Sequence, residues 1–193
     1  MEPEHDERYP GMVRTDATLS LAMTSVVSLP LTLAILAVFL VPYVLIWGAP
    51  TISGAAGAAL QVWGFVLLFI LGIVAHEGLH AVGWAVFGRI PWRHIEFGIK
   101  SLTPYTHCSV PISVMAYRLG AALPGFALGV MPAGIGLLLG SGWLVLWGAV
   151  FAAAASGDFI ILWLIRRTPN EALVLDHPDR AGCVILTPIE PQE

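Results

Sequence analysis

Charged residues are scarce in this chain. Only 11% of its 193 residues are Asp, Glu, Lys or Arg, whereas 57% are hydrophobic. A soluble domain carries roughly 25% charged residues, so this composition indicates an integral membrane protein. The few Lys and Arg residues form no basic stripe, which argues against nucleic acid as a partner. The N-terminus is acidic and no short apolar core with a small-residue cleavage site follows it, so we expect no removable signal peptide.

Long apolar runs, by contrast, are abundant. A hydrocarbon layer is crossed by a helix of about 20 apolar residues, and four runs reach that length: 26–47, 58–87, 114–139 and 143–165. Prolines interrupt the first and third of them, where we expect kinks: Pro30, Pro42, Pro124 and Pro132. The sequence therefore predicts an all-α integral membrane protein with four transmembrane helices.

We divide the chain into three parts on this basis. A polar tail spans 1–20, a four-helix membrane domain spans 21–167, and a polar C-terminal tail spans 168–193. The Lys and Arg residues lie in the tails, in the 88–113 loop, at the start of the third run or directly after the fourth, whereas the connections 48–57 and 140–142 carry none. The positive-inside rule then predicts a multi-pass protein of the cell membrane, with both termini and the 88–113 loop in the cytoplasm.

The second apolar run carries ionisable residues. His76, Glu77 and His80 spell H-E-x-x-H, and residues four apart share one face of a helix, so both imidazoles can bind one metal ion. An ionisable group in a bilayer core costs a few kcal/mol or more and usually has a function there. Zinc suits imidazole ligands. Glu77 could then take a proton from a zinc-bound water whose pKa has fallen to about 7, which is the chemistry of peptide-bond hydrolysis.

A catalytic zinc needs a third protein ligand. The only other acidic residue within the four apolar runs is Asp158, in a stretch rich in Ala and Gly that lets helices approach closely. At about 1.5 Å per residue, His76 lies about 27 Å along its run and Asp158 about 22 Å along its own, in the same direction. We therefore predict that His76, His80 and Asp158 hold one zinc ion. The alternative for Asp158 is a hydrogen bond to a neighbouring helix.

These motifs resemble a known family. A membrane helix with H-E-x-x-H, a later helix with an aspartate and a cytoplasmic loop between them are similar to the site-2 proteases, intramembrane zinc metalloproteases that cut membrane-spanning substrates. The stretches "AHEGLHAVGWAVFG", "PYTHCSVPISVMAYRLGAALPGFALG", "SGDFIILW" and "VLDHPDRAGC" resemble more closely a family of small zincin peptidases catalogued as a domain of unknown function. The resemblance covers roughly 60–185 and implies a zinc metalloendopeptidase. Site-2 proteases commonly have glycine after the aspartate, whereas Phe159 stands here.

The 88–113 loop has a strand-like pattern. In "RHIEFGIK", polar or small residues alternate with Ile95, Phe97 and Ile99, and "YTHCSVP" could pair with this stretch across "SLTP". A short cytoplasmic β-hairpin is thus one interpretation, and its edge could receive a substrate as an added strand. The alternative is a re-entrant loop that only seals the cytoplasmic end of the site.

Several residues in this loop and in the C-terminal tail are further candidates for a functional or structural role. His107 and Cys108 could serve as accessory groups, either as a regulatory fourth ligand or as an oxyanion donor, or His107 could simply be solvated. Cys108 and Cys183 both fall on the cytoplasmic side, so we expect no structural disulfide. Asn170 is expected to cap a short turn. His177, between Asp176 and Asp179, suggests either a second metal site or, as we prefer, a turn.

Three classes of function are compatible with these residues. The first is an intramembrane or membrane-interface zinc metalloprotease that cuts membrane-spanning or membrane-associated proteins, with Glu77 as general base and then proton donor. The second is a non-catalytic zinc-binding membrane protein, such as a pseudoprotease or assembly factor. The third is a metal or proton transporter. Glu77 favours the first over the second, because binding alone needs no base, and four spans without inverted repeats disfavour the third. The sequence leaves the oligomeric state open.

Overall fold

The apolar runs fold as helices in a computed structural model, which describes all residues except 1–3, 6–8, 50–54, 101–102, 178–179 and 189–193. Helix α1 spans Leu21–Trp47 and α2 spans Ala55–Phe87. The third run folds as three consecutive pieces, namely α3 (Val114–Pro124), the π-helical turn η2 (Gly125–Val130) and α4 (Met131–Leu139). The fourth run folds as α5 (Gly142–Ala154) and α6 (Ser156–Leu164). The predicted helical character of all four runs is confirmed.

Three of these helical segments are long and apolar enough to cross a membrane. They are Ala22–Trp47, Val62–Phe87 and Val114–Leu139. The fourth run is bent by 45° between α5 and α6, and it brings the number to four only if the bent pair counts as one span. Most of α1 and residues 62–71 of α2 face outward, with Leu45 80% and Trp63 72% exposed, which is the surface that a lipid-facing helix needs.

Both proline-bearing runs remain helical throughout. Pro30 and Pro42 lie within the single helix α1, whereas Pro124 ends α3 and the π-helical turn η2 follows it directly. A π-turn is a common way for a helix to absorb a break in its hydrogen-bond ladder. The third run therefore changes its winding beside the predicted metal site, at the position where the sequence predicted a kink.

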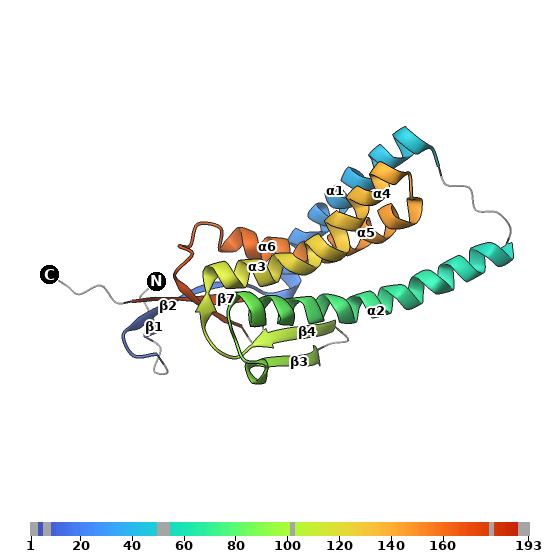
Figure 1. The fold of residues 1–193 in the computed structure, drawn as a ribbon. Coiled ribbons are helices and arrows are strands. Elements are labelled where there is room, and N and C mark those ends of the chain that lie inside the picture. The colour runs from blue at the N-terminus through green and yellow to red at the C-terminus, as the bar shows by residue number, and fades with distance from the viewer. Residues whose placement is uncertain (1–3, 6–8, 50–54, 101–102, 178–179, 189–193) are drawn as a thin grey trace.

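The two chain ends pair with each other in a five-stranded antiparallel sheet, ordered β1-β2-β7-β6-β5. Its strands are β1 (Glu4–His5), β2 (Met12–Leu19), β5 (Ile112–Ser113), β6 (Leu173–Asp176) and β7 (Ala181–Pro188). Strand β2 pairs with β7 along its whole length, from Met12 opposite Pro188 to Leu19 opposite Ala181. Figure 1 shows this sheet, both chain ends and the start of α3 at one end of the molecule.

The predicted hairpin is present in the 88–113 loop. After the short 3-10 helix η1 (Trp92–His94), β3 (Ile95–Lys100) pairs antiparallel with β4 (Thr103–Cys108), and the turn between them lies outside the described residues. The Tyr105 ring lies over Gly98, and a Cβ at that position would come within 2.5 Å of the far end of the ring. Figure 1 shows the hairpin running along α2.

The buried core lies where the helices meet the five-stranded sheet. Its members are Trp84, Cys108, Ile112, Val114, Tyr117, Ile165, Val174 and Cys183. Helices α2 and α3 approach closely there, since a Cβ on Gly83 would come within 2.6 Å of the Cα of Gly120. This small-residue contact brings the H-E-x-x-H segment of α2 directly against α3.

Candidate metal centre

Two helices far apart in sequence bring three ligand-type side chains together. The Nε2 atom of His76 lies 3.2 Å from Oδ2 of Asp158, and Nε2 of His80 lies 3.5 Å from Oδ1 of the same carboxylate. One ligand atom from each of the three residues falls within 4.8 Å of the other two. Among the described residues, this is the one group of His, Cys, Asp and Glu side chains found close enough to hold a metal ion.

The spacing of these atoms fits zinc. Zinc binds nitrogen and oxygen at about 2.0–2.2 Å in a tetrahedron, which places neighbouring ligand atoms about 3.3–3.6 Å apart. The separations of 3.2 Å from His76 to Oδ2 of Asp158 and of 3.5 Å from His80 to Oδ1 are of this size, and the three groups lie within reach of one ion. Two imidazoles and one carboxylate also leave a fourth position for water, as catalytic zinc sites require.

A break between α5 and α6 delivers Asp158. The chain leaves the helical conformation at Ala155 (φ −75°, ψ 7°), and α6 restarts at Ser156 with Asp158 in its first turn. Glycines permit the close packing around this break: a Cβ on Gly125 would lie 2.9 Å from Ala155, and one on Gly129 would lie 2.6 Å from the backbone of Ala152. The π-turn therefore packs directly against the segment that carries Asp158.

His80 is oriented by groups on α3. Its Nδ1 lies 3.0 Å from the carbonyl oxygen of Gly120, so a hydrogen on Nδ1 leaves Nε2 free to face Asp158. Its ring stacks on Trp84, with the centroids 5.7 Å apart, and Trp84 stacks in turn on Tyr117 at 5.5 Å. The imidazole is thus fixed both by a hydrogen bond and by an aromatic stack before any metal binds.

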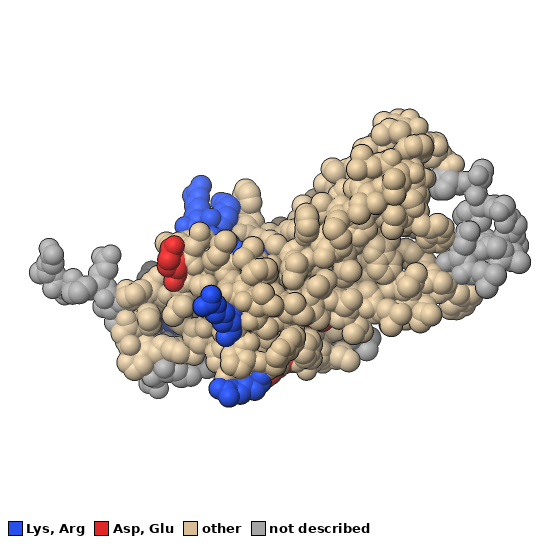
Figure 2. Space-filling model, in the orientation of Figure 1, with Lys and Arg blue, Asp and Glu red and all other residues tan. Residues whose placement is uncertain are grey.

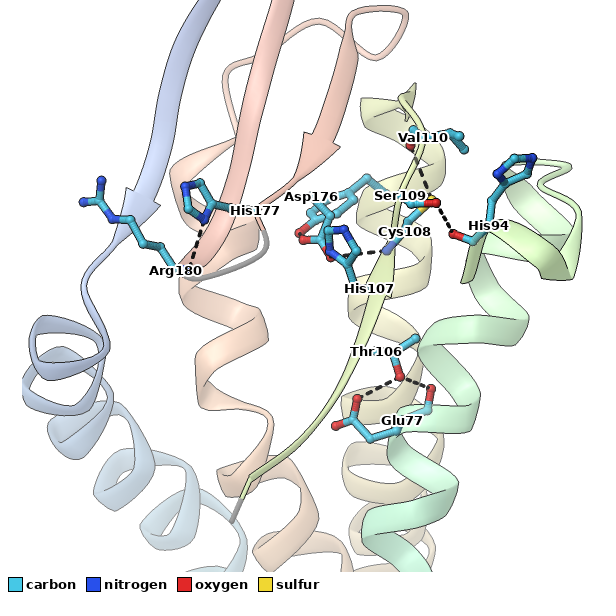
Figure 3. A network of polar contacts seen from close by, with 11 residues as sticks. Glu77, His94, Thr106, His107, Cys108, Ser109, Val110, Asp176, His177 and Arg180 are labelled. Carbon is cyan, nitrogen blue, oxygen red and sulfur yellow. Dashed lines mark hydrogen bonds and ion pairs between the residues drawn. The ribbon is translucent and has the colours of Figure 1, made fainter. Parts of the chain in front are cut away.

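Glu77 faces strand β4 of the hairpin. The Thr106 hydroxyl lies 2.9 Å from Oε2 of Glu77 and 2.9 Å from the Glu77 backbone oxygen (Figure 3). Thr106 itself is buried. The predicted base therefore has a side-chain partner, and that partner comes from the hairpin rather than from the helices.

The two accessory candidates meet Asp176 of β6. Nδ1 of His107 lies 3.0 Å from Oδ2 of Asp176, and the backbone N–H of Cys108 donates to the same oxygen at 3.4 Å (Figure 3). The Tyr117 hydroxyl donates to Oδ1 of Asp176 at 2.9 Å. The hydrogen bond to Asp176 raises the pKa of His107, and burial raises the pKa of the Cys108 thiol. Neither residue belongs to the group around Asp158.

The remaining candidates make local contacts. Cys108 and Cys183 are both free and buried, and burial raises the pKa of Cys183 to about 12. Asn170 accepts a hydrogen bond from the Arg118 guanidinium at 2.7 Å. The ring of His177 accepts the backbone N–H of Arg180 at 3.0 Å, as in a turn, while Asp179 lies outside the described residues. Through its hydrogen bond to Asn170, Arg118 ties the start of α3 to the segment that follows α6.

Sequence reasoning missed three residues that support the site: Thr106, Gly120 and Asp176. Thr106 stood within the predicted hairpin, but only the packing of β4 on α2 reveals that its hydroxyl reaches Glu77. Gly120 acts through a backbone carbonyl, which leaves no trace in a residue pattern. Asp176 was weighed only as a partner of His177, whereas its carboxylate accepts from His107 and Tyr117.

The fold and the site define a helical protein with a candidate metal centre of two imidazoles and one carboxylate, set in helices apolar enough for a membrane. The profile of one protein family, described as "Putative zincin peptidase", matches residues 69–173, more than half of the chain. The chain belongs to this family, whose description indicates a zinc metallopeptidase. No curated protein and no solved structure matches the chain.

Proposed function

We propose that the protein is an intramembrane or membrane-interface zinc metalloprotease of the site-2-protease type. One observation carries this proposal: His76, His80 and Asp158 converge within 4.8 Å, and Glu77 stands beside the two histidines on a helix that could span a membrane. A base next to the ligands is what hydrolysis needs and what a purely structural metal site does not.

The residues of the chain have distinct roles in this mechanism. His76, His80 and Asp158 would hold zinc, which supplies a Lewis acid that activates water and polarises the peptide carbonyl. Glu77 takes a proton from the attacking water and passes it to the nitrogen of the leaving amine. Gly120 and Trp84 keep His80 in the orientation that the site requires.

The position of the site along α2 supports cleavage within the membrane. Eleven residues separate His76 from Phe87 at the end of α2, or about 16 Å at 1.5 Å per residue. The hydrocarbon core is about 30 Å thick, so this depth would place the reaction near the middle of the bilayer if Phe87 lies at the surface of that core. Charged side chains gather over the sheet end in Figure 2, and by the positive-inside rule that end faces the cytoplasm of the cell membrane.

The hairpin offers a way to present a substrate. Thr106 lies level with Glu77, so the β3–β4 pair extends to the depth of the site. The outer backbone groups of a two-stranded sheet need water or a further strand, because lipid cannot satisfy them. An unwound segment of a membrane-spanning or membrane-associated protein could supply that strand.

Metal content and proteolysis, measured together on detergent-purified protein, test the proposal. The probe is a fluorogenic peptide with a single span of about 20 apolar residues. We expect the wild type to hold one zinc ion and to cut the probe, Glu77→Gln to hold zinc without cutting, and Asp158→Ala to lose zinc. A protein with its hairpin replaced by a Gly-Ser linker should keep zinc and lose cleavage.

The contrary outcomes point to the other classes. If the protein binds zinc but Glu77→Gln has the same activity as the wild type, the site is structural, as in a pseudoprotease or assembly factor. Metal-dependent flux across vesicles without cleavage would indicate a transporter. Cleavage that survives removal of the hairpin would reduce that hairpin to a seal over the site.

A further inference from the structure

The hydroxyl of Thr106 faces two acceptors at once. It lies 2.9 Å from a carboxylate oxygen of Glu77 and 2.9 Å from the backbone oxygen of the same residue. A threonine hydroxyl has one hydrogen to donate and two lone pairs with which to accept. It can therefore donate to the carboxylate, or turn its hydrogen to the backbone oxygen and accept from the protonated carboxyl. Both arrangements keep the Glu77 side chain in one place.

Strand β4 is itself held in place next to Thr106. Successive side chains of a strand point to opposite faces, so Thr106 meets α2 while His107 meets Asp176 on β6 at 3.0 Å. Asp176 also accepts from the backbone of Cys108 and from the Tyr117 hydroxyl. Figure 3 shows these contacts at neighbouring positions of one strand. The Thr106 hydroxyl is thus presented by a strand that cannot slide freely along α2.

We propose that Thr106 is a positioning residue for Glu77, supplied to the site by the hairpin. This inference rests on the proposed function, because it assigns Glu77 the role of the base. A base must stay within hydrogen-bond reach of the proton that it moves, and groups that orient active-site residues commonly change activity by about 10- to 100-fold when lost. The hairpin then contributes to the chemistry of the site as well as covering it.

A direct test follows the Glu77 carboxyl group by nuclear magnetic resonance in full-length, zinc-loaded protein with carboxyl-labelled glutamate. The signal that Glu77→Gln removes identifies Glu77. We expect Thr106→Val, which keeps the shape of the side chain but lacks the hydroxyl, to shift that signal. Thr106→Ser, which keeps the hydroxyl, should restore it. Thr187→Val, a strand position in β7, is the control and should leave it unchanged.

Kinetics on the single-span fluorogenic peptide provide a second readout. Thr106→Val should lower kcat by about 10- to 100-fold, with KM and zinc content unchanged, and Thr106→Ser should recover most of the loss. A Thr106→Val variant with a wild-type Glu77 signal and a wild-type kcat would overturn the inference. An equal loss of kcat in Thr106→Val and Thr106→Ser would also overturn it. If Glu77→Gln cuts normally, the proposed function fails instead, whatever Thr106 does.

Discussion

At the scale of single residues, Gly120 joins the packing of two helices to the orientation of His80, a candidate metal ligand. Its carbonyl oxygen lies 3.0 Å from Nδ1 of His80. Its missing side chain leaves room for Trp84, because a Cβ there would lie 2.2 Å from a ring atom of that tryptophan. Trp84 is 4% exposed and stacks on both His80 and Tyr117, so a shift of its ring would disturb both contacts.

Gly120→Ala should therefore damage both stability and metal binding. Forcing an extra methyl group into a packed core costs about 1–3 kcal/mol, and a displaced Trp84 would tilt the imidazole of His80. We expect a lower melting temperature in detergent and weaker zinc binding in competition with a chelator. Gly134→Ala on α4 is the matched control, since a Cβ there meets nothing within 4 Å. Equal stability and zinc affinity for the two variants would contradict this account.

The juxtaposition of the three ligand-type residues follows from the sequence to a large extent. H-E-x-x-H places His76 and His80 on one helical face, and the matched depths of two parallel runs bring Asp158 to the same level, as the 3.2 and 3.5 Å separations show. The sequence does not predict the groups that orient the site. A backbone carbonyl at Gly120 and a hydroxyl at Thr106 act through packing between segments, which no local spacing records.

At the scale of elements, the hairpin is docked by a titratable contact. His107 on β4 faces Asp176 on β6, with Glu96 opposite it on β3 and with Tyr117 of α3 and Cys108 beside the same carboxylate. The hydrogen bond to Asp176 raises the pKa of His107 in the folded protein. A raised folded-state pKa means that the protonated imidazole stabilises the docked strand.

Docking of β4 should therefore weaken as pH rises. The contribution of His107 is complete below its unfolded pKa of about 6.5 and is lost as pH passes through the higher folded value. Amide hydrogen exchange across Thr103–Cys108, corrected for the intrinsic pH dependence of exchange, should show declining protection over that window. His107→Gln should remove the decline. His94→Gln is the control and should keep it, because the His94 ring accepts a hydrogen bond from its neighbour Arg93 rather than from Asp176. An unchanged decline in His107→Gln would contradict this assignment.

The elements themselves differ in how far the sequence predicts them. The apolar runs and the hairpin were predictable, because each is a local pattern of hydropathy. The five-stranded sheet was not predicted, although Val13, Thr15, Ala17 and Leu19 alternate with polar residues in β2. Its partner β7 begins more than 160 residues later, and pairing at that distance has no local signature. The break at Ala155 was not predicted either, because it depends on how η2 packs against α5, which is also a contact between distant segments.

At the scale of the whole molecule, the candidate site lies near the end that holds the two sheets. Strands from the N-terminal and C-terminal tails pair with each other there, and α1 starts, α2 ends, α3 starts and α6 ends at this side (Figure 1). The core that joins the helices to the sheet includes Trp84, which stacks on His80. The paired chain ends are thus linked to the candidate metal centre through packed side chains.

The arrangement of the ends makes the topology testable. Both tails and the 88–113 segment share one end, and all nine Lys and Arg lie in these parts, at the start of α3 or directly after α6. The connection that contains Ser141 lies at the opposite end and carries none. The positive-inside rule then predicts that Arg93 faces the cytoplasm and Ser141 the outside.

Labelling with a membrane-impermeant maleimide checks this in sealed, right-side-out vesicles. The two native cysteines, Cys108 and Cys183, are buried and are first replaced by serine. Ser141→Cys should then react in intact vesicles, whereas Arg93→Cys should react only after the membrane is opened. The reverse pattern would invert the topology, and labelling of both sites in intact vesicles would mean that the apolar helices do not separate the two ends. In the expected pattern the end of α2 at Phe87 faces the cytoplasm. Glu77 then lies about 15 Å from that end, and a substrate would have to enter from the membrane or the cytoplasm.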